Sequence, residues 1–284
     1  MNTKLLKQLR TETGASFLLC KNALSHAKDD YQKALAYIDQ HQEKGESNKR
    51  VASKGVVVVA KKNNQAILFE VNAETDFITK NPHFNDFIND ITPKLLDSDV
   101  INPIDALNVK LENGKTIEEK LIQLEGLTKE NLKLRRLYRV NKNDMQVFGT
   151  YSHNHGKMAS LVVLNGNNES IANQLAMQVI AMNATYLSFD SIDQDTLNYE
   201  KMMYEKNHQN FEQKAFNDYL KSISLLNQSY IKDPNLTIKD LLTQNRLQLI
   251  DFYKFELGQG IDGKLNCRLD IPCDGSKITV TPIE

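Results

Sequence analysis

The stretch that decides how the chain folds is Glu70-Val71-Asn72-Ala73-Glu74-Thr75-Asp76-Phe77-Ile78-Thr79-Lys80. The apolar, β-prone residues 66–71 lead into it and predict a strand. Asn72, Thr75 and Asp76 are residue types whose side chains bond nearby backbone, so they predict a turn where the strand stops. The stretch therefore predicts a strand that ends in a polar turn, with Phe77 at the tip.

Phe77 is a large apolar side chain at a position where folding alone would favour a polar one. Two interpretations are open. In the first, Phe77 packs beneath Phe84 and Phe87 of the next helix; residue types alone favour this, because most aromatic side chains lie in cores. In the second, Asp76 and Phe77 form a wedge that is presented to a partner, because interface anchors are often aromatic.

Length and composition exclude several classes of protein. A chain of 284 residues predicts about two domains, and 40% hydrophobic with 25% charged residues fits a soluble globular protein. A formal net charge of −1 gives no basic field, so we expect no direct nucleic-acid binding. No apolar run reaches the ~18 residues of a membrane span. Three cysteines fit a reducing compartment, so we expect a cytoplasmic protein without membrane contact.

The first 42 residues predict a small domain of three short helices. The second helix carries apolar residues at i, i+3 and i+4 spacing from Phe17 to Ala27, and Cys20 lies on that face as a core residue. Leu19 falls beside this face, so an exposed edge formed by Leu18 and Leu19 would be a natural docking patch. Residues 43–54 are polar with little periodicity and predict a linker, with a frayed helix as the alternative.

The rest of the chain shows one pattern twice, namely two strands followed by a helix. It predicts an α+β fold with two core subdomains, residues 55–140 and 141–284, each built on an antiparallel sheet. The expected strands are 55–60, 65–71, 132–140, 145–151, 158–164 and 247–257. The expected helices are 82–91, 104–109, 117–124, 169–182 and 238–242; the second and third of these could also be partly ordered segments.

Residues 193–226 differ from their surroundings because they are polar and have only partial heptad order. They predict a protruding antiparallel helical hairpin that turns near residues 207–210 and is dispensable for the fold of the core. Pro234 is expected to end this region. Whether the hairpin forms a homodimer is open. The tail, residues 261–284, alternates weakly, and its function is open.

Motifs for nucleotide binding and for catalysis are missing from the sequence. There is no phosphate-binding Gly-x-x-x-x-Gly-Lys-Ser/Thr loop, no glycine-rich dinucleotide fingerprint and no nucleophile elbow. His153 and His155 lie one residue apart on an expected turn, and two ligands do not complete a zinc site. We therefore expect no metal site and no bound cofactor, and a binding protein rather than an enzyme.

Four segments resemble the elongation factor Ts family, in the family's order along nearly the whole chain. They are Leu9-Arg10-Thr11-Glu12-Thr13-Gly14-Ala15-Ser16-Phe17-Leu18-Leu19-Cys20-Lys21-Asn22-Ala23-Leu24, Glu70 to Ile78, Tyr151-Ser152-His153, and Phe255-Glu256-Leu257-Gly258-Gln259-Gly260-Ile261. The chain departs from the family pattern where Ala73 replaces a cysteine and Ile78 replaces a valine.

The resemblance implies a guanine-nucleotide exchange factor for elongation factor Tu, with a ubiquitin-associated-like N-terminal bundle. It implies that an Asp-Phe tip enters the partner, disturbs its Mg²⁺ site and loosens its GDP. That role falls on Thr75, Asp76, Phe77 and Ile78, so the resemblance favours the wedge interpretation. By the same resemblance Leu18 and Leu19 dock near the nucleotide domain, and His153 contributes a contact from the second subdomain.

Two other functions remain open on the residues alone. The first is a protein-interaction module without exchange activity. The second is a ribosome- or RNA-associated protein that uses Arg135, Arg136 and Arg139. These arginines fall on both faces of one expected strand, which disfavours a continuous basic patch.

Overall fold

The computed structural model describes residues 5–6, 8–9, 13, 17–41, 52–208 and 210–261. The fold is α+β, with helices and small antiparallel sheets, as the sequence predicts. The chain divides into two compact units, residues 1–56 with 69–138 and residues 57–68 with 139–284. The domain boundaries predicted at residues 42, 54 and 140 stay predictions.

The N-terminal bundle contains α2 (Phe17–His26) and α3 (Tyr31–His41), which pack against each other. Asp30 caps the start of α3, because its carboxylate accepts a hydrogen bond from the backbone N–H of Lys33 at 3.1 Å. The same bond lowers the pKa of Asp30. The buried core of the bundle is Leu6, Leu9, Cys20, Ala23, Leu24, Ala27, Ala34 and Ile38. Cys20 is thus a core residue, while the Leu18 and Leu19 side chains lie outside the described residues.

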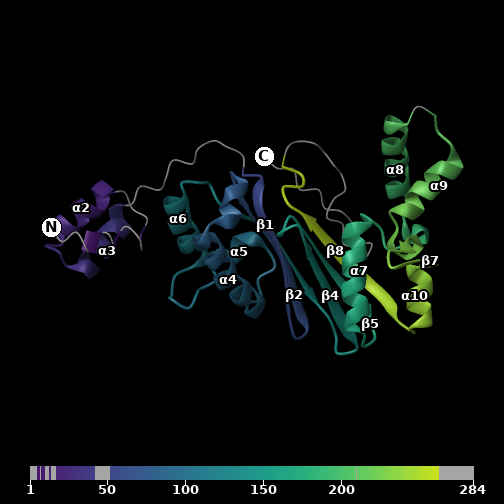
Figure 1. The fold of residues 1–284 in the computed structure, drawn as a ribbon, viewed down its shortest axis with the longest axis horizontal. Helices are drawn as coiled ribbons and strands as arrows, with labels where there is room; N and C mark the ends of the chain where they lie inside the picture. The colour runs from purple at the N-terminus through teal and green to yellow at the C-terminus, as the bar shows by residue number, and fades with distance from the viewer. Residues whose placement is uncertain are drawn as a thin grey trace. The chain divides into compact units, whose positions relative to one another are not determined.

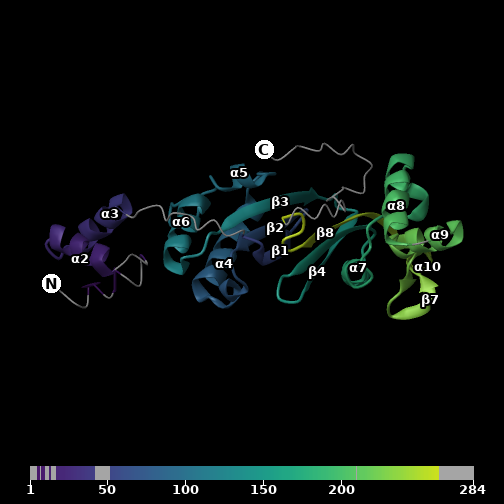
Figure 2. The same cartoon turned by 90° about the horizontal axis from the view of Figure 1, so that it is seen from above.

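The first sheet has the strand order β1 (Lys54–Lys62), β2 (Gln65–Ala73) and β3 (Lys133–Asn141) (Figures 1 and 2). The middle strand β2 is buried from Ala66 to Ala73, whereas β1 buries only Gly55 and Val57 and is otherwise half-buried or exposed. A strand that is covered on both faces needs apolar residues throughout, so the single charged residue in this run, Glu70, requires partners inside the fold.

Three helices accompany the first sheet: α4 (Pro82–Asp97), α5 (Pro103–Ala106) and α6 (Ile117–Thr128). Helix α4 buries Phe84, Phe87 and Ile91, as its spacing predicts. It continues beyond the predicted end at residue 91 and passes through Pro93, because Leu95 and Leu96 in its last turns are also buried. Helix α6 starts with a capping box between Thr116 and Glu119, and α4 packs against it.

The second sheet is antiparallel, in the order β4 (Gln146–His153), β5 (Met158–Asn165) and β8 (Gln248–Glu256). Helix α7 (Glu169–Ala181) packs on β4 and β5. Gly149 of β4 permits this packing, because a Cβ atom at that position would lie 2.0 Å from the backbone carbonyl carbon of Ala172. Val162, Leu164, Leu175, Val179 and Phe252 belong to the resulting core.

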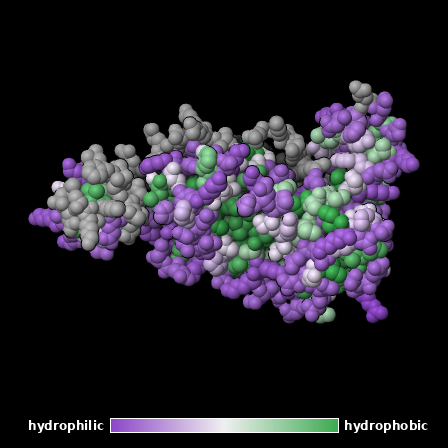
Figure 3. Space-filling model, in the orientation of Figure 1, coloured by the Kyte–Doolittle hydropathy of each residue, from purple (hydrophilic) through white to green (hydrophobic). Residues whose placement is uncertain are grey.

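The polar region contains α8 (Gln194–Asn207) and α9 (Gln213–Ser222), flanked by the short helices η2 (Phe189–Ser191) and η3 (Leu225–Asn227). The visible face of this pair is mostly hydrophilic (Figure 3). It has its own small core of Phe216, Leu220 and Ile223. Glu200 is buried there and accepts hydrogen bonds from the hydroxyls of Tyr186 at 2.7 Å and Tyr219 at 2.9 Å.

A short ribbon follows, formed by β6 (Ser229–Tyr230) and β7 (Asp233–Thr237), and leads into α10 (Ile238–Gln244). This ribbon was not predicted from the sequence, in which Pro234 was expected to end the hairpin region. Pro234 lies in β7, where a two-stranded ribbon tolerates proline at an edge position. The tail after residue 261 lies outside the described residues.

We expect Gly149→Ala to destabilise the second unit by ~1–3 kcal/mol or more, because the new methyl group overlaps backbone that cannot give way easily. Urea unfolding followed by circular dichroism measures the change. Ser152→Ala, an exposed position on the same strand, is the matched control and should stay within ~0.5 kcal/mol of the natural chain. Equal midpoints for the two variants would contradict the proposed close packing of α7 on β4.

Candidate functional site

The predicted turn is a short 3₁₀ helix, η1 (Asp76–Lys80), that directly follows β2. A 3₁₀ helix has three residues per turn, so neighbouring side chains point in different directions. Ile78 points inward and is 2% exposed, whereas Phe77 is 71% exposed. Phe84 and Phe87 are buried without Phe77 above them. Phe77 is thus a surface residue in the described structure, and the packed alternative that residue types favoured is wrong.

The start of the turn is fixed by the loop between α6 and β3. The Glu130 carboxylate accepts two hydrogen bonds from Thr75, one from its backbone N–H at 3.0 Å and one from its hydroxyl at 2.7 Å. In the opposite direction, the Glu74 carboxylate accepts a hydrogen bond from the backbone N–H of Asn131 at 3.3 Å. Three hydrogen bonds therefore join two neighbouring residues of each segment.

The end of the turn is fixed by the start of α4. The backbone N–H of Asn81 donates to the carbonyl of Ile78 at 2.9 Å, and the Asn81 side chain caps α4 by accepting from the N–H of His83. Pro82 occupies the first helical position, where its missing N–H has no consequence. Within the turn, the Thr79 hydroxyl donates to the carbonyl of Asp76 at 2.9 Å. Phe77 is therefore presented on backbone that is held at both ends.

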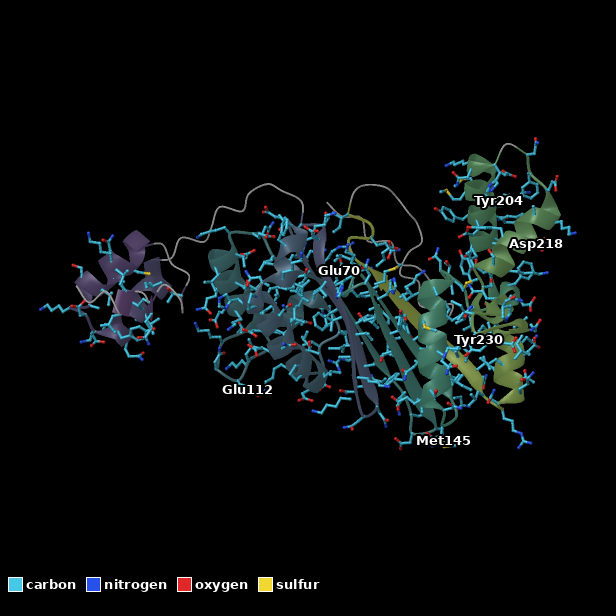
Figure 4. The ribbon with its side chains drawn as sticks, in the orientation of Figure 1. Glu70, Glu112, Met145, Tyr204, Asp218 and Tyr230 are labelled. Carbon is cyan, nitrogen blue, oxygen red and sulfur yellow. The ribbon has the colours of Figure 1, made fainter. Side chains whose placement is uncertain are left out.

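Glu70, at the start of the deciding stretch, is completely buried in β2 (labelled in Figure 4). Its carboxylate forms ion pairs with two arginines of β3, the guanidinium of Arg135 at 3.1 Å and the Nε of Arg136 at 2.5 Å. Asn72 adds a hydrogen bond at 2.8 Å. This cluster was not predicted from the sequence, where its only local signal is a charged residue in an otherwise apolar strand. Two of the three arginines considered for RNA binding, Arg135 and Arg136, form ion pairs with Glu70, which weighs against the RNA-binding alternative.

His153 is the last residue of β4 and is exposed. Its Nδ1 lies 3.2 Å from the hydroxyl of Tyr151, and the two rings stack with centroids 6.0 Å apart. His153 belongs to the second unit, whereas the turn belongs to the first. Within the described residues no group of three or more His, Cys, Asp or Glu side chains could hold a metal ion.

Comparison with known proteins gives two findings. The family model described as "Elongation factor TS" matches residues 74–259. The chain belongs to the elongation factor Ts family. The elongation factor Ts of Acholeplasma laidlawii (strain PG-8A) is 34% identical over 281 residues, which cover 92% of this chain and 94% of that protein. The resemblance found in the sequence is confirmed.

Membership of the elongation factor Ts family makes the chain a guanine-nucleotide exchange factor of translation elongation, with elongation factor Tu as its partner. The matched region begins at the turn and includes Thr75 to Ile78 as well as His153. It does not extend to Leu18 and Leu19. Among the described helices, none is long and apolar enough to cross a membrane.

We expect Glu70→Ala to cost ~3–5 kcal/mol of unfolding free energy, because it leaves two partly buried guanidinium groups without their counter-charge. Glu112→Ala is the matched control, since Glu112 pairs with Lys94 at 3.3 Å on the surface and should contribute ~1 kcal/mol or less. Urea unfolding of both variants measures the difference. A Glu70→Ala midpoint as high as that of Glu112→Ala would refute the structural role of the cluster.

Proposed function

We propose that the turn from Thr75 to Ile78 enters the nucleotide domain of elongation factor Tu, disturbs its Mg²⁺ site and so promotes the release of GDP. One observation carries this proposal: a phenylalanine is 71% exposed on a turn whose two ends are both fixed. Placing a large apolar side chain in water lowers no folding free energy, whereas a partner that buries it gains roughly 1.5–3 kcal/mol.

The four residues have different roles in this proposal. Phe77 is the wedge that displaces a partner element, and the exposed Asp76 carboxylate rearranges polar contacts next to it. Thr75 fixes the start of the turn through Glu130. Ile78, which the resemblance placed among the partner-binding residues, is buried, so we propose that it supports the turn from below.

Exchange by this route needs no catalytic side chain and no cofactor of its own. Mg²⁺ and the phosphate contacts of GDP hold each other in place in the partner, so removing one weakens the other. A factor that binds the nucleotide-free form more tightly must, by linkage, lower the affinity for GDP by the same factor. A coupling of about 3 kcal/mol changes that affinity about 150-fold.

We further propose that Leu18 and Leu19 dock the N-terminal bundle near the nucleotide domain and that His153 adds a contact from the second unit. The place of action is the cytoplasm, without direct binding of nucleic acid or membranes. A homodimer through residues 193–226 stays a proposal, and sedimentation of the purified chain tests it.

We expect Phe77→Ala to lower the GDP-release rate of elongation factor Tu by tenfold or more, with a change in unfolding free energy within ~0.5 kcal/mol. A buried phenylalanine would instead cost ~3–5 kcal/mol. Stopped-flow release of a fluorescent GDP analogue measures the rate. The loss should shrink when Mg²⁺ is chelated, because the step that Phe77 promotes has then already occurred.

Ile104→Ala is the matched control, since Ile104 is 75% exposed in the same unit but lies on α5. It should release GDP at the rate of the natural chain. Full exchange by Phe77→Ala, or a loss that its unfolding explains, defeats the assignment of the wedge. No acceleration of GDP release by the natural chain would instead favour an interaction module without exchange activity.

We expect a chain that lacks residues 1–51 to keep a folded core but to need a higher concentration for half-maximal exchange. The bundle has its own core, so little of the remaining structure depends on it. The cut stops before β1 because the Lys54 carbonyl accepts a hydrogen bond from Asn72 at 3.3 Å. Titration of the GDP-release rate measures the effect, and an unchanged half-saturating concentration would rule out docking through the bundle.

A further inference from the structure

Glu130 belongs to none of the motifs in the sequence, yet its carboxylate contacts the base of the turn directly. It is half-buried, and both of its carboxylate oxygens accept hydrogen bonds from the same residue, Thr75. Thr75 is the residue that precedes η1, and its hydroxyl caps no backbone N–H of that helix. The turn thus has no local side-chain cap, and the residue before it is held instead by a carboxylate 55 residues further along the chain.

We propose that Glu130 is a positioning residue that fixes the direction of the turn and so aims Phe77 at the partner. The effect of Glu130 on nucleotide exchange rests on the proposed function, whereas its role in fixing the turn does not. Glu130 does not act on the nucleotide or on Mg²⁺. It acts through Thr75, which lies two residues before Phe77.

The position of Glu130 is itself determined by well-packed structure. Helix α6 buries Leu121 and Leu124 and ends at Thr128, and its C-cap residue Lys129 has a left-handed backbone (φ 60°) that reverses the chain. The Glu125 carboxylate accepts the backbone N–H of Leu132 at 2.8 Å, which closes the loop on its other side. A carboxylate that projects from such a loop can hold a neighbouring segment, because it loses little side-chain freedom to do so.

Loss of the clamp should broaden the directions that the turn samples. Only molecules whose Phe77 points correctly can complete the displacement step. The maximal exchange rate is therefore proportional to the fraction of such molecules. Docking through the rest of the surface is unaffected. The maximal exchange rate should therefore fall while the half-saturating concentration changes little, which distinguishes aiming from general binding.

The first experiment tests the clamp in the free protein. The chain contains no tryptophan, so Phe77→Trp places a single indole at the exposed tip. Time-resolved fluorescence anisotropy of this variant reports the local motion of the tip. Adding Glu130→Ala should lower the residual anisotropy, whereas adding Glu130→Gln should leave it near the starting value. Glutamine can keep both contacts, because its oxygen accepts from the Thr75 N–H and its amide donates to the hydroxyl.

The second experiment measures exchange in chains that keep Phe77. We expect Glu130→Ala to lower the maximal GDP-release rate about tenfold, the equivalent of ~1.4 kcal/mol, with the half-saturating concentration within about twofold. Glu130→Gln should restore most of the rate. Glu112→Ala, which removes an exposed carboxylate of the same unit, should match the natural chain. Thermal unfolding of each variant shows that the turn and not the unit is affected.

The outcomes separate this inference from the proposed function. Unchanged anisotropy in the Glu130→Ala background overturns the clamp, whatever the exchange data show. If Phe77→Ala releases GDP slowly but Glu130→Ala releases it at the full rate, the aiming role is overturned. Loss of GDP release in Glu130→Gln would show that the charge contacts the partner directly, and this result also overturns the aiming role. Full activity of Phe77→Ala overturns the proposed function, and the anisotropy then still decides whether Glu130 holds the turn.

Discussion

The buried ion-pair cluster around Glu70 is the constraint on which the first unit depends. A carboxylate without solvent contact is stable only when cations and hydrogen-bond donors surround it, and β3 supplies Arg135 and Arg136 for this purpose. These contacts fix β2 beside β3 at one register, because a shift by one residue would leave three charges unpaired. Two apolar strands of the same shape would lack this penalty for slipping.

The fixed register has a consequence for the turn. Strand β2 continues directly into Glu74 and Thr75, and the segment before β3 contains Glu130 and Asn131, so the register brings these two segments side by side. The hydrogen bonds between them form only when the strands are correctly aligned. The buried charges thereby determine where the exposed turn begins, although Glu70 itself lies several residues away from Phe77.

Local patterns in the sequence predicted most of the helices and strands, but not which distant side chains contact one another. The predicted helix 169–182 corresponds to α7 and the predicted strand 247–257 to β8, because periodicity records which residues face inward. Glu70 and its arginines are 65 and 66 residues apart, and no local pattern states which distant residue meets a buried charge. Residue types had already marked Asp76 and Phe77 as a possible wedge, and the family resemblance added Thr75 and Ile78, whereas Glu130 has no motif around it.

Phe77 shows why residue type alone misled. An aromatic residue next to a helix usually packs inward, but a 3₁₀ turn has one inward position here, and Ile78 occupies it. The inward isoleucine and the outward phenylalanine are thus two results of one backbone geometry.

That geometry also favours exchange, since a side chain held in its working direction loses little freedom when it meets a partner. A flexible tip would bury the same apolar area but would lose more entropy at the moment of contact. A rigid turn therefore binds the partner with more free energy, and this free energy lowers the affinity of the partner for its nucleotide. A rigid turn thus accelerates release more than a flexible turn with identical side chains.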